Sequence, residues 1–269
     1  MPKFRVQASS DWINIVFWYS MRKSTWLALA LVVGAGAQES RRPEFDPRLT
    51  VHTLVREDIF AGFLVDDMER FARGEKTLER LLLERPEAKP AILTWQAGAT
   101  LKHALIAQKQ NRTAEFEQLY RRSLSLFAEA LRLAPDSPDV AAVTGGSYAV
   151  LADQLPEKYR LAAWSKAYDA YQVLWKLQAP LVDQAPLHIK GELLAGLAQS
   201  AQRSGRVAEL PQYLALMLQY LPNSAYAARA REWKDKPEVA AHTKVTCQSC
   251  HEPGRLAAQT AALAKLASK

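Results

Sequence analysis

GELLAGLAQSAQRSGRVAELPQYLALMLQYLPNS, residues 191–224, is the stretch that decides the fold class. On both sides of Gly205, apolar and small residues return every three or four positions, which is the spacing of one face of an α-helix. Gly205 favours a turn between two helices, and Pro222 ends the second one. The stretch therefore predicts a pair of antiparallel helices, over residues 187–203 and 207–221.

The length of this unit and its spacing resemble a tetratricopeptide (TPR) repeat, through Leu194-x2-Leu197-Ala198-x2-Ala201, Gly205, Leu210-x3-Leu214-x2-Met217 and Pro222. It departs from the family pattern where Trp, Gly and Tyr are usual, because those positions hold Leu194, Ala198 and Ala201. Partial matches occur earlier, at Ser123-x3-Phe127-x2-Ala130-x4-Pro135 and at Ala167-x3-Tyr171 with Pro180 one place late.

The resemblance implies an all-α fold in which residues 55–233 form a TPR-like α-solenoid of antiparallel helix pairs. Such units stack because none buries its apolar face alone, and the stack leaves a groove that commonly holds a peptide or another protein. A generic helical bundle with proline stops is the alternative.

The rest of the central region is also helical in pattern, and strand signals are absent. Gly74 is expected to break the chain between two of the helices, Thr113 to cap another, and Gly145-Gly146 to loosen a third. The expected helices are 57–72, 77–84, 91–108, 113–133, 139–153, 159–177 and 225–233.

Residues 21–37, MRKSTWLALALVVGAGA, have the three parts of a secretory signal peptide. Arg22 and Lys23 precede an apolar run too short to span a bilayer, and small residues precede a cleavage site after Ala37. The segment predicts a periplasmic or otherwise secreted protein. Residues 1–20 then read as an upstream start-site extension before a true initiator at Met21, and residues 38–54 as a flexible lead-in.

The formal charge of +7 at pH 7 falls to +4 without residues 1–37, which hold four basic residues and one acidic residue. The remaining basic residues are interleaved with acids, so nucleic acid is not an expected partner. No segment after residue 37 is apolar for long enough to cross a membrane. Hydrolase motifs and phosphate loops are absent, so no catalytic residue is predicted.

Both cysteines lie near the end of the chain in VTCQSCHEPG, residues 245–254. Cys247, Cys250 and His251 form the C-x-x-C-H pattern of covalent haem attachment. The two thiols add to the vinyl groups of the porphyrin, and the adjacent histidine supplies the proximal ligand of the iron. A zinc site that includes His242 and a small disulfide loop are the alternatives.

KVTCQSCHEPG, residues 244–254, resembles the haem segments of c-type cytochromes, especially those of multihaem cytochromes. The resemblance implies one covalent haem c in a segment spanning residues 234–269. The sixth iron ligand is left open between His242, Met217, a ligand from another chain and an empty site. Residues 256–266 are expected to form an amphipathic helix that packs on the haem or on the preceding helices.

These observations predict an exported monohaem c-type cytochrome-like protein that transfers electrons or binds haem and docks a redox partner protein on its helical array. Two other functions stay open. One is a periplasmic TPR-type scaffold without haem, and the other is a gas sensor or peroxidase-like protein with an open iron site.

Overall fold

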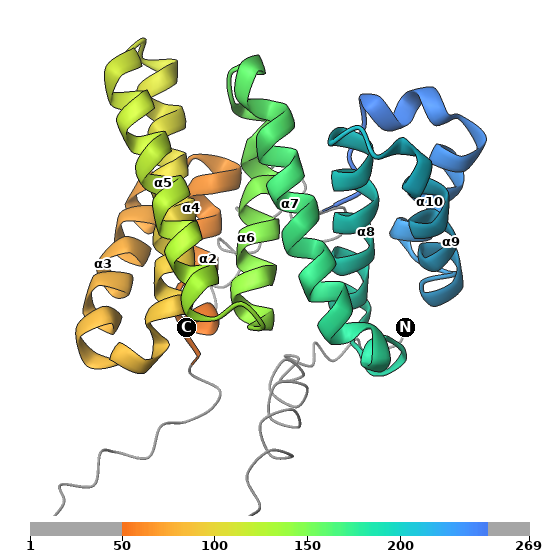
Figure 1. Cartoon of the computed structure of the whole chain (residues 1–269), viewed down its shortest axis with the longest axis horizontal. Coiled ribbons are helices and arrows are strands. Elements are labelled where there is room, and N and C mark those ends of the chain that lie inside the picture. The colour runs from red at the N-terminus through yellow and green to blue at the C-terminus, as the bar shows by residue number, and fades with distance from the viewer. Residues whose placement is uncertain (1–49, 247–269) are drawn as a thin grey trace, which may run out of the picture.

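The structure is a computed structural model that describes residues 50–246, and this part of the chain is all-α (Figure 1). It contains no strand within those residues, so the predicted fold class is confirmed at this level. Short 3₁₀ turns join several of the helices. The α-helices are α2 (Val51–Val65), α3 (Met68–Glu84), α4 (Lys89–Lys109), α5 (Thr113–Leu133), α6 (Pro138–Leu151), α7 (Glu157–Gln178), α8 (Leu187–Arg203), α9 (Leu210–Tyr220) and α10 (Ala225–Asp235).

Helices that follow one another in the chain pack together, as α2 does with α3, α4 with α5, α6 with α7, and α8 with α9. A second set of contacts joins every other helix, from α2 to α4, α4 to α6 and α6 to α8. In Figure 1 the helices stand side by side from α3 at one end to α9 and α10 at the other. Each pair is therefore covered by its neighbour.

Several helix starts follow from single polar side chains that accept a hydrogen bond from the backbone of the first turn. Thr50 Oγ1 accepts from Thr53 N at 3.2 Å, and Asp67 Oδ1 from Arg70 N at 3.1 Å. Ser137 and Ser224 cap α6 and α10 in the same way. Because Thr50 caps α2, residues 51–54 are helical, and the lead-in predicted to run to residue 54 was too long.

The predicted break at Gly74 was wrong, because the break lies at Asp66 and Asp67. Asp66 adopts a left-handed backbone conformation, with φ of 54°, and Asp67 caps the next helix. Gly74 lies inside α3, where a Cβ atom would be 2.9 Å from Ile59 Cδ1. Gly74 allows α2 and α3 to pack closely, and it does not end a helix.

Two smaller predictions also differ from the structure. Thr113 is the first residue of α5 and does not cap it, since the N-cap position is held by Arg112. Gly145 and Gly146 lie within a continuous α6. Gly145 meets the ring of Tyr171, whereas a Cβ atom on Gly146 would meet no described atom within 4 Å.

The hydrophobic core extends along the array from Val51 in α2 to Val245 beyond α10. Among α7, α8 and α10, glycine residues allow the closest contacts between helices. A Cβ atom on Gly196 of α8 would lie 2.2 Å from Tyr171 Cζ of α7, and one on Gly191 would lie 2.4 Å from Tyr226 Cε2 of α10. Glycine at these positions therefore sets how near α7 and α10 come to α8.

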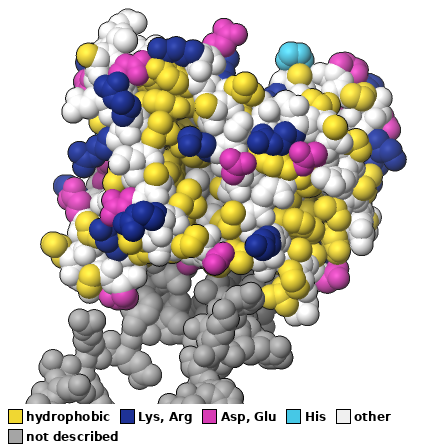
Figure 2. All heavy atoms as spheres, in the orientation of Figure 1, with side chains coloured by type: hydrophobic (Ala, Val, Ile, Leu, Met, Phe, Trp, Pro, Cys, Tyr) yellow, Lys and Arg dark blue, Asp and Glu magenta, His cyan; other side chains and the backbone are white. Residues whose placement is uncertain are grey.

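On the face shown in Figure 2, basic and acidic side chains are interspersed, with hydrophobic side chains between them. Among residues 50–246, the helices lack the combination of length and apolar composition that crossing a bilayer requires.

Candidate functional site

The predicted haem residues Cys247, Cys250 and His251 lie outside the described residues, as does the signal segment 21–37. The structure describes the chain up to Thr246, the residue directly before Cys247. It shows how α8 contacts the residues that directly precede the C-x-x-C-H pattern. We call residues 239–246 the anchor segment.

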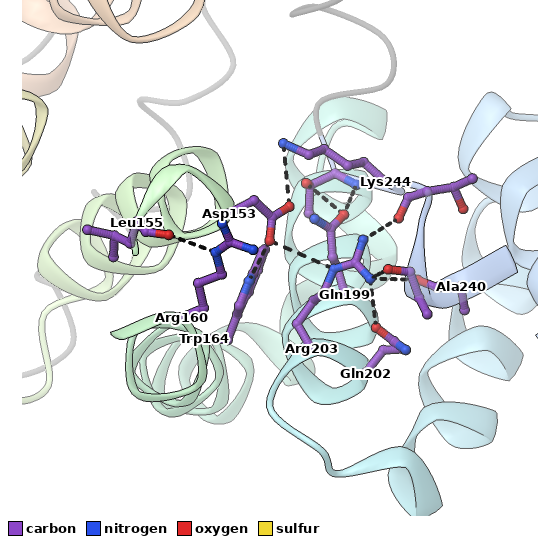
Figure 3. Close-up of polar contacts among 12 residues, drawn as sticks. Asp153, Leu155, Arg160, Trp164, Gln199, Gln202, Arg203, Ala240 and Lys244 are labelled. Atoms are coloured by element: carbon purple, nitrogen blue, oxygen red, sulfur yellow. Dashed lines mark hydrogen bonds and ion pairs between the residues drawn. The ribbon is translucent and has the colours of Figure 1, made fainter. Parts of the chain in front are cut away.

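Gln199 of α8 holds the end of the anchor segment (Figure 3). Its Oε1 atom accepts hydrogen bonds from Val245 N at 2.8 Å, Thr246 N at 3.1 Å and Thr246 Oγ1 at 3.0 Å. Gln199 and Val245 are fully buried, and Thr246 is 3% exposed. Two backbone N–H donors fix the orientation of this amide, because only the oxygen can accept from them.

The nitrogen of the Gln199 side-chain amide, Nε2, is buried and lacks a hydrogen-bond partner among the described residues. A buried donor without a partner costs about 1–3 kcal/mol, so such groups usually mark a partner that is supplied from elsewhere. The atom lies beside the point at which the described chain gives way to Cys247.

Arg203, one turn further along α8, holds the middle of the anchor segment through backbone carbonyls. Nη1 donates to Ala240 O at 3.1 Å and to Ala241 O, and Nη2 donates to Thr243 O at 3.0 Å. Burial lowers the pKa of Arg203, and the nearby carboxylate of Asp153 acts in the opposite direction. A planar guanidinium with several donors suits this task because it can bond to several oxygens at once.

Asp153, in the turn after α6, connects the anchor segment to the neighbouring helix pair (Figure 3). Its Oδ1 atom accepts from Trp164 Nε1 at 2.8 Å and lies 4.0 Å from Arg203 Nε. Its Oδ2 atom lies 3.8 Å from the half-exposed Nζ of Lys244. The carboxylate is thus shared among α7, α8 and the anchor segment.

Trp233 of α10 closes the anchor from the other side. Its Nε1 atom donates to Thr243 Oγ1 at 2.7 Å, and that hydroxyl donates to Val239 O at 2.8 Å. These contacts fix the backbone of the anchor segment up to Thr246.

The two residues predicted as sixth ligands lie in different surroundings. His242 is exposed at the end of the 3₁₀ turn Pro237–Ala241, where its N–H donates to Val239 O at 3.0 Å. Met217 is fully buried in the hydrophobic core on α9. Within residues 50–246, no three His, Cys, Asp or Glu side chains are grouped to hold a metal ion.

A pocket opens between α2, α4, α6, α7 and α8, and we call it the central pocket. It has an empty volume of about 880 Å³, part of which is open to solvent. Aliphatic and small residues form most of its wall, and Gly146 adds open space to it. Its polar and aromatic lining includes His52, Arg56, Phe60, Trp95, Tyr171, Gln178, His188 and Glu192.

His52 is held neutral in this pocket. Loss of solvent around the imidazole, and then the positive charges of Arg56 and His188, lower its pKa to about 3. The ring also packs against Trp95, with ring centroids 5.5 Å apart. The acidic residue that lines the same pocket is Glu192.

We expect His52 to make the protein sensitive to acid. Its folded-state pKa lies below the unfolded value near 6.5, so its contribution to stability is present above pH 6.5 and is lost as the pH falls toward 3. The loss should approach about 1.4 kcal/mol per pH unit within that window. Denaturant unfolding of wild type and His52→Asn at pH 7, 5 and 4 measures it, and equal pH profiles would contradict the expectation.

Comparison of the chain with family models, with curated proteins and with solved structures gives no significant match. The function must therefore be argued from the residues of this chain.

The sequence did not single out the residues that hold the anchor segment. Gln199, Arg203 and Asp153 bond to positions far away in the chain, which no local pattern reveals. The one available signal was the placement of Gln199 and Arg203 four residues apart on α8, where they share one face of the helix. His52 and His188 gave no signal before the pocket was known.

Proposed function

We propose that this chain is an exported monohaem c-type cytochrome-like protein. One haem would be attached to Cys247 and Cys250, with His251 as the proximal ligand of the iron. When bound, the haem supplies one-electron exchange. The observation that carries the proposal is the anchor segment, which fixes the chain up to the residue before the C-x-x-C-H pattern.

The anchor supports a fixed placement of the attached group. Gln199, Arg203 and Trp233 hold the segment through seven hydrogen bonds, five of them to backbone atoms. A redox group that exchanges electrons with a partner is most effective when its position is set by rigid elements. Beneath the segment lie the buried amide of Gln199 and the partly exposed guanidinium of Arg203, and these contacts support a role for the tail.

The rest of the chain would form a TPR-like α-solenoid that docks a protein partner. The order of helix contacts supports this, since sequential pairs pack together and α2, α4, α6 and α8 touch in succession. In the unit 191–224, Gly205 has φ of 80° in the turn, and the small residues Ala198 and Ala201 are fully buried. The interspersed charges on the face in Figure 2 suit a protein partner better than a nucleic acid.

Covalent attachment is tested by expressing the chain with cytochrome c maturation machinery and staining a denaturing gel for haem. We expect wild type to stain and Cys247→Ala/Cys250→Ala to lose all staining, because both thioether bonds would be removed. Ser249→Ala, in the same segment, is the matched control and should stain like wild type. Circular dichroism checks that all three variants keep the same helical content.

The same preparation separates the alternatives. Wild type with free thiols or a disulfide, by intact mass, would leave the periplasmic TPR-type scaffold as the function. Sequencing of the mature N-terminus tests export, and cleavage after Ala37 is the expected result. Rapid carbon monoxide binding by the reduced wild-type protein would favour the open-site sensor or peroxidase-like function.

A further inference from the structure

The central pocket combines an apolar wall with a positive charge. Val143, Leu174 and Leu193 supply aliphatic surface from α6, α7 and α8. Phe60 and Trp95 supply aromatic rings, which meet edge to face with their centroids 5.8 Å apart. Sites for small molecules in proteins commonly have such walls together with a few polar groups that fix the orientation of the ligand.

The size of the pocket limits what it can hold. Its enclosed part has a volume of about 110 Å³. Since an apolar protein cavity of about 150 Å³ holds benzene, the enclosed part accommodates at most one ring or a branched chain of similar size. Gly146 borders this space, and a Cβ atom on it would meet no described atom within 4 Å. Glycine is less favourable than alanine inside a helix, so glycine here keeps space open without improving the packing of the helices.

Arg56 of α2 supplies the positive charge. Its side chain is 34% exposed, and its Nε atom donates to Glu57 Oε1 at 3.1 Å. No other hydrogen bond joins this guanidinium to a described residue, so both Nη groups remain available to a ligand. Burial is the largest cause of the lowered pKa of His52, and the charge of Arg56 is the next. Arg56 therefore acts on the wall of the pocket as well as on the solvent.

The pocket also contains a carboxylate, which decides where a second one can bind. Glu192 lines the pocket, and its Oε1 atom accepts a hydrogen bond from Tyr226 Oη at 2.6 Å. A carboxylate on a ligand would be repelled by Glu192 and attracted by Arg56. We therefore expect the charged end of a ligand beside Arg56 and its apolar end in the enclosed part.

We propose that the central pocket binds a small monocarboxylate, with one ring or branched chain in the enclosed part and the carboxylate on the Nη groups of Arg56. A guanidinium can bind a carboxylate through two parallel hydrogen bonds, and such charge-assisted bonds are about twice as strong as neutral ones. The inference goes beyond the proposed function and does not depend on it, because every residue that carries it lies before Thr246.

The test titrates the isotope-labelled full chain with benzoate and follows it by nuclear magnetic resonance. We expect about 10 mM benzoate, enough to detect millimolar binding, to shift the signals of the Trp95 indole N–H and the Gly146 amide. Benzoate should bind about tenfold more tightly than benzamide, which has the same ring but no charge. Arg56→Gln should weaken benzoate binding by about that factor and leave benzamide binding unchanged.

Two further variants complete the test. Arg229→Gln is the matched control, because Arg229 also pairs with an acid of its own helix, Glu232, at 2.8 Å, and it lies outside the pocket. It should bind benzoate like wild type. Gly146→Leu fills the open space and should weaken the binding of both benzoate and benzamide, while circular dichroism checks its helical content.

Three results overturn the inference. One is benzoate that shifts neither the Trp95 nor the Gly146 signal of wild type. Another is Arg56→Gln that binds benzoate as tightly as Arg229→Gln does, a comparison that holds even if Gly146→Leu fails to fold. The third is tighter binding of benzylamine than of benzoate, which would show that Glu192 selects a cation.

Discussion

Replacing Gly196 with alanine should destabilise the protein by about 3 kcal/mol, the upper end of the usual cost of overpacking a core. The new Cβ atom would lie 2.2 Å from Tyr171 Cζ, 2.3 Å from Cε1 and 2.6 Å from Cε2. Tyr171 is 4% exposed, and its ring also lies against Gly145 of α6, where a Cβ atom would be 3.0 Å from Cε2, so the ring has little room on that side. The two helices would have to separate.

Gly146→Ala is the matched control, because it makes the same chemical change within a helix. Its Cβ atom would meet no described atom within 4 Å, so only the gain in helix propensity remains. We expect the haem-free chain to become more stable by about 0.5–1 kcal/mol. Urea unfolding followed by circular dichroism measures both variants, and a Gly196→Ala protein as stable as Gly146→Ala would show that α7 and α8 are not packed as described.

Gln199→Leu should release the anchor segment while leaving the helical array folded. Leucine has nearly the same volume but cannot accept the hydrogen bonds of Val245 N, Thr246 N and Thr246 Oγ1. Three buried donors without an acceptor would cost several kcal/mol if the segment stayed in place, at about 1–3 kcal/mol for each donor. If the anchor segment detaches, water can accept these hydrogen bonds and the cost is avoided. The variant should therefore change the anchor segment and leave the helices folded.

Hydrogen exchange measures this release directly. We expect the amides of Val245 and Thr246 to exchange at least 100-fold faster in Gln199→Leu than in wild type, since about 2.7 kcal/mol of protection corresponds to that factor. Gln202→Leu is the control on the same helix, because the Gln202 side chain bonds only to Arg203 in the described contacts. Equal exchange rates in wild type and Gln199→Leu would be incompatible with the anchor.

Much of the fold could be predicted because helix periodicity is a local property. The prediction of a helix over 187–203 agrees with α8 at both ends, and 113–133 agrees with α5. The errors came where local signals compete. Gly74 looked like a break, but it is a packing residue, and the real break at Asp66 needs a left-handed backbone that aspartate adopts less often than glycine.

The haem chemistry of the candidate site stays a prediction, because Cys247, Cys250 and His251 lie outside the described residues. C-x-x-C-H names the thiols and the imidazole because that chemistry needs them at fixed spacing. The anchor could not be predicted, since Gln199 and Thr246 are 47 residues apart and meet only through the packing of α8, α9 and α10. The same holds for His52 of α2 and His188 of α8, which are far apart in sequence and line one pocket in space.

Five of the anchoring hydrogen bonds join main-chain atoms of the segment to the side chains of Gln199 and Arg203. Every amino acid except proline has those N–H groups, and every amino acid has those carbonyls. Substitutions other than proline at the exposed positions 241, 242 and 244 should therefore be well tolerated. Ala240 and Val245 are buried, and Thr243 accepts a hydrogen bond from Trp233, so these positions and the glutamine and arginine of α8 must be kept. A different terminal tail, joined after Thr246, could be grafted onto the same helical body without redesigning the body itself.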